Sequence, residues 1–310
     1  MNHLFQGDER VSNQLKADFA MLVVTMFWGS SYLFMKLGLM DIHVLNLIAM
    51  RFGIAFLLSG AIFYKRLLKV DKSTFYRGMI LGILLFFVFV AITYGVQYTS
   101  ATHAGFLVSL AVVFVPILAS TMTGQKIQIR VIVSVCAAIL GVALLTLNDK
   151  FRINPGDILC ILGAILYAVH IIVTSVFTRT ANAITMGTVQ LGFTGLLGLF
   201  FGMFFGGSQL PSTPNAWVAV LALSILCSAF GFIVQTVTQK YTPPTHTGLI
   251  FSTEPVFTVI FAYFFQGETL SPRGIAGAFI VLLSVIFAEV DPKKLFATVS
   301  IYKRRVNARR

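Results

Sequence analysis

The sequence predicts an all-α membrane protein with ten transmembrane helices, built as two inverted five-helix repeats with both termini in the cytoplasm. Composition is the first observation behind this prediction: 57% of the 310 residues are hydrophobic, 11% are charged, and the mean hydropathy is +0.88. A water-soluble domain of this length could not bury so much apolar surface. In addition, apolar runs of helix length recur along the chain, and one segment returns 143 residues later.

Ten apolar runs are about 20 residues long, the length that a helix needs to cross a hydrocarbon core of about 30 Å. They cover approximately residues 18–38, 44–64, 77–97, 101–122, 130–147, 157–178, 184–206, 216–239, 244–265 and 272–290. Backbone groups cannot stay unpaired in lipid, and the runs lack the short alternation of a membrane barrel, so helices are predicted. Residues 1–17 form a polar cytoplasmic segment without the pattern of a signal peptide, and residues 291–310 form a basic tail.

Lysine and arginine predict the orientation, because they concentrate in cytoplasmic loops. With cytoplasmic termini, 18 of the 23 basic residues fall on the cytoplasmic side, whereas Lys150, Arg152 and Arg273 fall outside. The remaining two, Lys36 and Arg51, lie within predicted helices. The net charge of +12 is therefore explained by topology and lipid headgroups, and we expect no nucleic-acid partner.

The repeated segment relates YTSATHAGFLVS, from Tyr98 to Ser109, to YTPPTHTGLIFS, from Tyr241 to Ser252. Six positions are identical at the offset of 143 residues. A repeat of five helices is odd, so the second copy enters the membrane from the opposite side and the repeat is inverted. The predicted repeats cover residues 18–147 and 157–290.

Glu254 is the first candidate for function, because it lies in an apolar run long enough to cross a bilayer, where a charge is costly. Pro255 removes one helical hydrogen bond beside it, so a kinked helix with a carboxylate at the break is predicted. The carboxylate either receives a substrate ammonium group or takes the proton that drives exchange; a purely structural pairing is the alternative. The equivalent position in the first repeat is Ala111, so the carboxylate belongs to one repeat only.

Several other polar or aromatic side chains lie at membrane depth. Arg51 and its pseudo-equivalent Gln190 are interpreted as cavity-lining residues, with structural pairing as the alternative for Arg51. Further candidates for substrate contact are Trp28, Ser31, Tyr32, Tyr94 and His170. Small residues beside these, such as Gly29, also serve for close helix packing.

Two histidines occupy equivalent positions in the repeats, at opposite faces of the membrane. His103 opens the fourth predicted helix and His246 opens the ninth, so both are candidates for gating or proton coupling, and loop contacts are the alternative. Asp18 and Asp157, each in the first turn of a predicted helix, are interpreted as favourable charges near helix N-termini.

Other chemistries leave no pattern in the sequence. The cysteines, Cys136, Cys160 and Cys227, lie in apolar runs without paired spacing, so we interpret them as packing residues. The histidines show no HExxH or i, i+4 spacing, and neither GxxxxGK[ST] nor GxSxG occurs. We therefore expect no metal, no cofactor and no enzymatic activity.

A family resemblance adds to this reading. WGSSY at residues 28–32, Arg51, the paired segments from Thr99 and Thr242, the Glu254-Pro255 step and GE at residues 267–268 together resemble the EamA-type branch of the drug/metabolite transporter superfamily. The resemblance implies a ten-helix carrier, commonly an exporter of amino acids or related metabolites across the bacterial inner membrane. Helices 1–4 and 6–9 would enclose a central cavity, with helices 5 and 10 at the periphery. GQ at residues 124–125, where many relatives have GE, departs from the pattern.

The leading hypothesis is a secondary transporter, acting as a monomer on a small-molecule substrate, surrounded by lipid and with protons as a candidate coupling ion. Amino-acid export is favoured because Glu254 together with Arg51 or Lys36 matches an ammonium and a carboxylate. Uptake or exchange of a nucleotide-related or vitamin-like solute fits the same fold. An intramembrane enzyme and a non-transporting sensor subunit are the alternatives from other classes.

Overall fold

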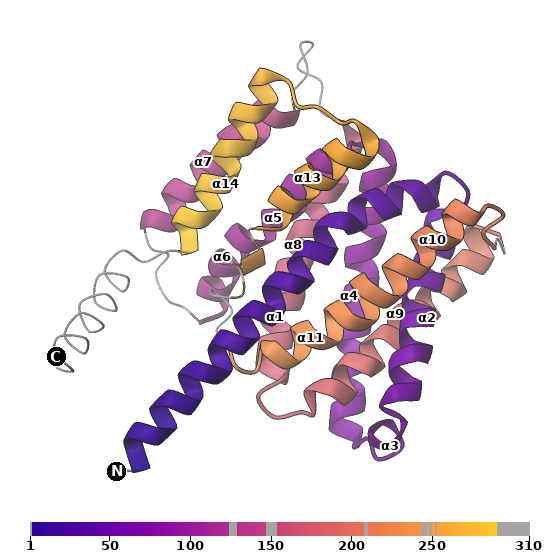
Figure 1. The fold of residues 1–310 in the computed structure, drawn as a ribbon, viewed down its shortest axis with the longest axis vertical. Helices are drawn as coiled ribbons and strands as arrows, with labels where there is room; N and C mark the ends of the chain where they lie inside the picture. The colour runs from indigo at the N-terminus through magenta and orange to yellow at the C-terminus, as the bar shows by residue number, and fades with distance from the viewer. Residues whose placement is uncertain are drawn as a thin grey trace.

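The structure is a computed structural model, and it describes residues 2–123, 129–146, 154–207, 210–242, 247, 250–251 and 253–289. Within these ranges every regular element is a helix (Figure 1). The helices are α1 (Asn2–Leu39), α2 (Val44–Ile62), α3 (Tyr64–Leu67), α4 (Lys72–Tyr98), α5 (Ala101–Ser109), α6 (Ala111–Thr123), α7 (Ile129–Thr146), α8 (Pro155–Phe177), α9 (Ala183–Phe205), α10 (Pro214–Ala222), η1 (Leu223–Phe230), α11 (Gly231–Thr238), α13 (Glu254–Gln266) and α14 (Pro272–Glu289).

Seven helical stretches of the described chain are long and apolar enough to cross a membrane, and they make this a multi-pass membrane protein. They are Gln14–Leu39, Val44–Ile62, Lys72–Tyr98, Ala101–Ser120, Pro155–Phe177, Ala183–Phe205 and Pro214–Thr238. Shorter apolar helices, Ile132–Leu144 and Pro272–Ser284, lie where the fifth and tenth helices are predicted. The count of ten helices and the cytoplasmic position of the termini stay predictions.

The ends of the later helices in each half follow the same offset of 143 residues. Helix α6, Ala111–Thr123, corresponds in both bounds to α13, Glu254–Gln266. Helix α7, Ile129–Thr146, corresponds in both bounds to α14, Pro272–Glu289. The predicted sequence repeat is therefore matched by repeated local structure.

Contacts between the two halves are reciprocal. Helix α4 packs against α8, and α1 packs against α10 and α11, so each of these contacts joins a helix of one half to the corresponding partner in the other. Helices α2 and α9, which are equivalent in the two halves, pack against each other. This arrangement is what an internal two-fold relation requires.

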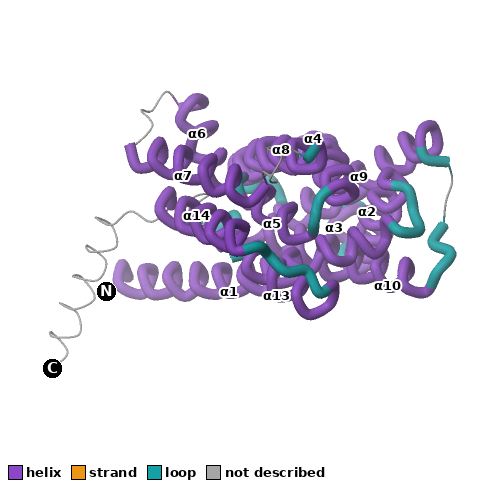
Figure 2. Tube along the Cα trace, turned by 90° about the horizontal axis from the view of Figure 1, so that it is seen from above, coloured by secondary structure: helices purple, strands orange, loops and turns teal. Residues whose placement is uncertain are grey.

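Helices α7 and α14 lie side by side at one edge of the bundle, as Figure 1 shows, and Figure 2 places α2 and α9 on the other side. The backbones of α7 and α14 approach closely at Gly141, where an added Cβ would lie 2.8 Å from the carbonyl oxygen of Gly277. Small residues at such crossings let membrane helices pack without a large side chain between them. The α7–α14 pair thus lies at the periphery, and the other helices surround the core.

Short polar residues cap several helices, because the first backbone N–H groups of a helix have no partner within it. Asp71, Asn154, Asn182 and Thr213 each accept a hydrogen bond from a backbone N–H in the first turn of α4, α8, α9 and α10 respectively. Helix α13 ends at Gln266, and the next residue, Gly267, has a φ of 65°, in the left-handed region that glycine adopts easily. These local signals position the ends of the helices that carry the site.

Two features of the predicted helices are wrong. Helix α1 begins at Asn2, so Asp18 lies inside a helix rather than in its first turn; residues 2–17 contain no proline that would stop the helix. The run predicted as one α-helix over residues 216–239 contains a π-helical stretch, Leu223–Phe230, between α10 and α11. Two side chains of the candidate site, described below, contact this stretch at Cys227 and Ser228.

Candidate functional site

A small cavity lies at the centre of the bundle, and we call it the central cavity. Its lining comes from α1, α2, α4, α5, α8, α11 and α13, and its volume is about 30 Å³. The lining residues are Trp28, Ser31, Tyr32, Met35, Arg51, Val88, Phe89, Ile92, Val108, Tyr167, Phe232 and Glu254. Five of the predicted site residues, Trp28, Ser31, Tyr32, Arg51 and Glu254, are thus brought together from three helices.

Glu254 is the first residue of α13, so the interruption predicted from Pro255 is present at this position. Its side chain is only 6% exposed, and Oε1 accepts a hydrogen bond of 2.7 Å from the hydroxyl of Tyr32. A carboxylate in the first turn of a helix is stabilised by the partial positive charge of the helix N-terminus. The first half is interrupted at the equivalent place, between α5 and α6, but Ala111 stands there.

Gly29 lets the start of α13 approach α1. A Cβ added at Gly29 would lie 2.6 Å from Cβ of Phe257 and 3.0 Å from the carbonyl oxygen of Glu254, closer than packed atoms allow. The interpretation of Gly29 as a close-packing residue is therefore confirmed. Because Tyr32 lies three residues after Gly29 on α1, this close approach also sets the Tyr32–Glu254 hydrogen bond.

Arg51 is 2% exposed and lies among aromatic rings. Its Nε donates a 2.7 Å hydrogen bond to Oγ of Ser228, and its guanidinium lies 4.3 Å from the centre of the Phe89 ring. Its buried Nη1 has no hydrogen-bond partner in the described chain. Arg51 and Glu254 line the same cavity without forming a direct ion pair. A positive guanidinium and a negative carboxylate are therefore both available to a ligand.

Trp28 fixes one wall of the cavity through the π-helical stretch. Its indole Nε1 donates a 2.8 Å hydrogen bond to the carbonyl oxygen of Cys227, and the ring contacts Phe232 and Phe251 at centroid distances of 5.1 Å. Gly231 leaves room for the indole, because a Cβ there would lie 2.6 Å from Nε1. The π-helix thus holds both Trp28 and Arg51, through Cys227 and Ser228, and π-helical turns are frequent at functional sites.

His170 and Gln190 form a layer behind the cavity. Nε2 of His170 lies 3.2 Å from Oε1 of Gln190, and Nε2 of Gln190 donates to Oγ1 of Thr236 at 3.3 Å. The His170 ring stacks against Tyr167, at a centroid distance of 5.9 Å, and Tyr167 lines the cavity. Both predicted residues therefore touch the site through other side chains and are absent from the lining itself.

The remaining predicted residues lie elsewhere. Tyr94 packs against His43 near the end of α4, with ring centroids 6.2 Å apart, and does not line the central cavity. His103 belongs to a polar network at one end of the bundle. His246 lies outside the described residues, so its predicted role has no structural counterpart here.

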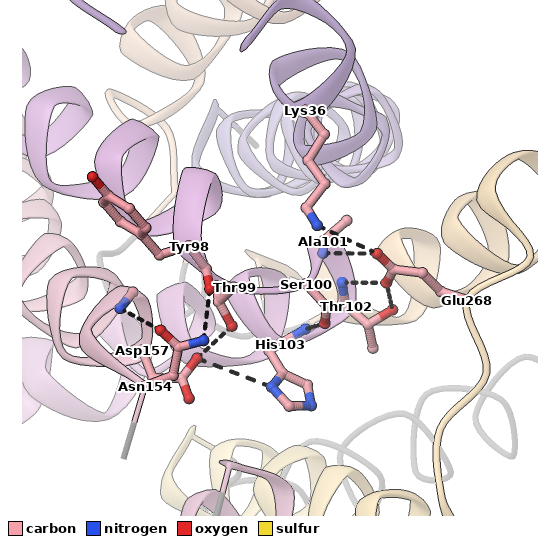
Figure 3. A network of polar contacts seen from close by, with 11 residues as sticks. Lys36, Tyr98, Thr99, Ser100, Ala101, Thr102, His103, Asn154, Asp157 and Glu268 are labelled. Atoms are coloured by element: carbon pink, nitrogen blue, oxygen red, sulfur yellow. Dashed lines mark hydrogen bonds and ion pairs between the residues drawn. The ribbon is translucent and has the colours of Figure 1, made fainter. Parts of the chain in front are cut away.

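The polar network containing His103, which we call the Glu268 network, ties four segments together (Figure 3). Glu268 accepts hydrogen bonds from the backbone N–H groups of Ala101 and Thr102, both 3.1 Å, and from the Thr102 hydroxyl at 2.9 Å. Nζ of Lys36 lies 3.9 Å from the same carboxylate. Glu268 therefore supplies the acceptor that the N-terminus of α5 needs, and Lys36 adds a link to α1.

Asp157 makes the second part of the network. The Thr99 hydroxyl donates to Oδ1 of Asp157 at 2.5 Å, and Nδ1 of His103 lies 4.0 Å from the same oxygen. Asn154, which caps α8, donates from Nδ2 to the carbonyl oxygen of Tyr98 at 2.6 Å. The start of α8 is thus held to the junction of α4 and α5.

A matching contact occurs at the corresponding junction of the other half. The Thr242 hydroxyl donates to Oδ1 of Asp18 at 3.3 Å. Thr242 is the pseudo-equivalent of Thr99, and Asp18 is the pseudo-equivalent of Asp157, so the two contacts exchange under the internal relation. Asp18 and Asp157 therefore each bind a threonine of the other half, although only Asp157 lies in the first turn of its helix.

Seven of the twelve lining residues are not predicted from the sequence, and three of these seven are aromatic: Tyr167, Phe89 and Phe232. Tyr167 lies three residues before His170 on α8, so the helical spacing that points to His170 also points to it. The two phenylalanines are among 30 in the chain, and nothing in the sequence separates them from lipid-facing ones. Among the described residues, no group of three metal-ligating side chains occurs.

Comparisons with known proteins agree with this geometry. Residues 15–147 and 154–289 each match the EamA-like transporter family. An uncharacterized transporter of Archaeoglobus fulgidus is 28% identical over 285 residues, covering 92% of this chain and 89% of the relative. The uncharacterized transporter YoaV of Bacillus subtilis is 19% identical over 281 residues, covering 87% and 96%. One crystal structure shares the fold with a TM-score of 0.69 at 15% identity, covering 90% of this chain and 98% of its own.

Proposed function

The chain belongs to the EamA-like transporter family, and on this premise we propose that it is a secondary transporter that exports amino acids or related small metabolites by alternating access. A carrier of this kind binds its solute near the middle of the membrane, between two repeats, and opens the site to each side in turn. We place it in the bacterial inner membrane with both termini in the cytoplasm, following the distribution of lysine and arginine. One chain encloses the cavity, so we propose the monomer as the transporting unit.

The observation that carries the substrate class is the pair of Arg51 and Glu254 in the central cavity. Both are buried, both line the same space, and neither neutralises the other through a direct ion pair. A zwitterion supplies a carboxylate for the guanidinium and an ammonium group for the carboxylate. Such charge-assisted hydrogen bonds are the strong ones in a site of low polarity.

The aromatic walls fit the rest of such a solute. Trp28, Tyr167 and Phe232 line the cavity together with the two charged groups, and the Trp28 ring contacts Tyr167 edge to face and Phe232 at a tilt. Rigid rings cover an organic side chain without losing much side-chain freedom, and they also attract an ammonium group over their faces. The proposed site therefore combines two charge contacts with one apolar contact.

The cavity must enlarge before it takes any such solute. Its volume of about 30 Å³ has room for one or two water molecules, whereas sites for organic ligands occupy roughly 300–1,000 Å³. We interpret this conformation as one in which the site is closed. The Thr99–Asp157 and Thr242–Asp18 contacts then act as equivalent latches at the two ends, and transport needs each to open in its turn.

Glu254 is also the candidate proton carrier. Among the described residues its side-chain hydrogen-bond donor is the neutral hydroxyl of Tyr32, so the carboxylate can exchange a proton without losing an ion pair. Binding of a substrate ammonium and binding of a proton would then compete at one oxygen pair. This competition would couple export to proton entry. Uptake or exchange of a nucleotide-related or vitamin-like solute uses the same fold and is the second candidate.

A ligand screen tests the proposal. Purified protein is heated with amino acids, nucleobases or vitamins, and a ligand that raises the melting temperature of the parent should fail to do so for Glu254→Gln. The stabilising ligand is then loaded into liposomes containing the protein, and its efflux is measured under a proton gradient. Efflux of the unaltered solute supports a carrier, whereas recovery of a converted product, or no flux with any ligand that binds, contradicts it.

A further inference from the structure

An apolar groove runs along the outside of the bundle between α2 and α9, and we call it the α2–α9 groove. Its volume is about 770 Å³, far larger than the central cavity, and it is separate from that cavity. The lining residues are Ala49, Met50, Gly53, Ile54, Phe56, Leu57, Leu67, Val70, Phe75, Val189, Gly192, Phe193, Gly195, Leu196 and Leu199. Every one of them is apolar, so the groove offers no group that would select a polar solute.

Glycines form the floor of the groove. A Cβ added at Gly195 would lie 2.6 Å from the backbone nitrogen of Gly53, so the two helices cross there in close contact. A Cβ added at Gly53 itself would meet no atom within 4 Å, because that face opens into the groove. Leu57 and Leu196, with 67% and 59% exposure, stand at the rim. The α2–α9 groove therefore runs along the two helices and is open to the acyl chains of the surrounding lipid.

A basic pocket continues the groove at the end that carries the α2–α4 connection. This pocket, about 400 Å³ in volume, is lined by Lys65, Arg66, Lys69, Val70, Asp71, Thr74, Asn182 and Thr185. Val70 lines both the pocket and the groove, so the two spaces adjoin. The apolar α2–α9 groove therefore ends beside the basic side chains of Lys65, Arg66 and Lys69.

The cations of this pocket lack protein counter-charges. Within the described chain, no carboxylate forms an ion pair with Lys65, Arg66 or Lys69. The one acid in the lining, Asp71, is already engaged, since its two oxygens accept hydrogen bonds from the Thr74 backbone N–H at 2.9 Å and the Thr74 hydroxyl at 2.6 Å. The pocket therefore carries a net positive charge, because it contains three exposed basic side chains and one acid, Asp71, that caps α4.

We propose that the α2–α9 groove and its basic pocket bind one anionic phospholipid, with the phosphate headgroup at Lys65, Arg66 and Lys69 and the acyl chains along α2 and α9. Charge complementarity selects the anionic headgroup, because basic residues at the membrane surface attract acidic lipids and release counterions. Burial of methylene groups in the groove holds the chains. A zwitterionic lipid of the same chain length fills the groove but gains no net charge attraction in the pocket.

The consequence for the protein follows from the position of the groove. Gly53 lies two residues after Arg51 on α2, and Gly192 lies two residues after Gln190 on α9. A bound lipid therefore packs on the outer face of the two helices whose inner faces carry the central cavity and the residues behind it. We expect lipid occupancy to hold these helices together.

The test is native mass spectrometry of the full-length protein titrated with phosphatidylglycerol or with phosphatidylcholine of equal chain length. The parent should bind one phosphatidylglycerol more tightly than phosphatidylcholine. The triple variant Lys65→Gln, Arg66→Gln, Lys69→Gln should lose about 100-fold of the phosphatidylglycerol affinity, since each basic residue contributes roughly a factor of five. The matched control is Lys16→Gln, Arg179→Gln, Lys240→Gln, which removes the same charge outside the groove and should bind like the parent.

A second variant tests the groove independently of charge. Gly53→Leu fills the open floor without meeting a protein atom at Cβ, and it should weaken both lipids while the phosphatidylglycerol preference remains. Equal losses in the two triple variants would overturn the headgroup assignment. Unchanged binding by a folded Gly53→Leu protein, or full displacement of the lipid by inorganic phosphate, would overturn the groove assignment. The charge variants change exposed side chains only, so the proposal stays testable if Gly53→Leu does not fold.

Discussion

The hydroxyl of Tyr32 donates a 2.7 Å hydrogen bond to Oε1 of Glu254, joining the middle of α1 to the first residue of α13. The donor is neutral, and the nearest cation in the cavity lining, Arg51, makes no ion pair with the carboxylate. The negative charge of Glu254 is thus left for a partner that arrives from outside. This relationship separates the structural role of the side chain from its proposed function, because an amide oxygen can still accept from Tyr32.

We therefore predict that Glu254→Gln keeps the fold and loses the ligand. Substrate affinity should fall by about 10- to 100-fold, since a hydrogen bond to a charged group contributes roughly 1.5–3 kcal/mol. Thermal shift and liposome flux measure the two effects separately. Glu268→Gln is the control, because it makes the same change outside the cavity; equal affinity loss in both variants would contradict a specific role for Glu254.

Gly29 and Gly53 give a matched pair of alanine substitutions within predicted spans. Gly29→Ala should destabilise the protein by about 1–3 kcal/mol, because its Cβ would overlap Cβ of Phe257 at 2.6 Å. Gly53→Ala adds the same methyl group where nothing lies within 4 Å, and it should be neutral or slightly stabilising. Thermal unfolding in one detergent compares them. If the Gly29 variant melts at or above the temperature of the Gly53 variant, the close approach of α1 and α13 is refuted.

The two threonine–aspartate contacts should control opposite ends of the cavity. Thr99→Val should expose the cavity from the end that carries Glu268, and Thr242→Val should expose it from the other end, with about 10- to 100-fold more of the open form in each case. The measurement is labelling of a single cysteine at Ser31 by a membrane-impermeant maleimide, in right-side-out and inverted vesicles. Each variant is the control for the other, and labelling that rises equally from both sides in both variants argues against latches.

Asp41 should make stability depend on acid. It lies in the connection between α1 and α2, and hydrogen bonds from the Ser212 hydroxyl and backbone N–H lower its pKa below the ordinary value of 3.8. A lowered pKa in the folded state means that the contribution is full above pH 3.8 and is lost as pH falls through the lower value.

Asp41→Asn should accordingly melt below the parent at neutral pH, with the difference shrinking as pH falls to about 3. Melting temperatures of parent and variant between pH 3 and pH 7 provide the measurement. Ser212→Ala removes the first of the two donors and should reproduce part of the difference. A difference that stays constant across this pH range would show that the charge of Asp41 makes no contribution.

Much of the candidate site could be expected from local sequence. Pro255 predicts the interruption at Glu254, and α13 begins there; Gly29 predicts a close helix approach, and α13 supplies it. Both predictions work because proline and glycine act through their own backbone and need no knowledge of the partner. Charged residues at membrane depth are similarly informative, since lipid makes them costly anywhere except in a cavity or a pair.

Other features depend on which helices meet. His170 and Gln190 share the polarity of Arg51 but contact each other behind the cavity, and Tyr94 packs against His43 instead. Polarity and depth alone do not give the direction of a side chain around its helix. The same limit hides Tyr167, and it hides the contacts of Trp28 and Arg51 with Cys227 and Ser228 of the π-helical stretch.

The sequence by itself determined that the chain lies in a lipid bilayer, that it is all-helical and to which family it belongs. The length of its apolar runs, the charge of its loops and the repeat at 143 residues are properties of the chain alone. It also determined that one repeat carries a glutamate where the other has Ala111. Only the tertiary structure decided that Tyr32 is the partner of Glu254, that Arg51 lines the same cavity without an ion pair to Glu254, and that Asp157 and Asp18 bind Thr99 and Thr242 across the two halves. The reason is physical: these contacts join residues far apart in the chain, and helix packing alone sets which side chains face each other.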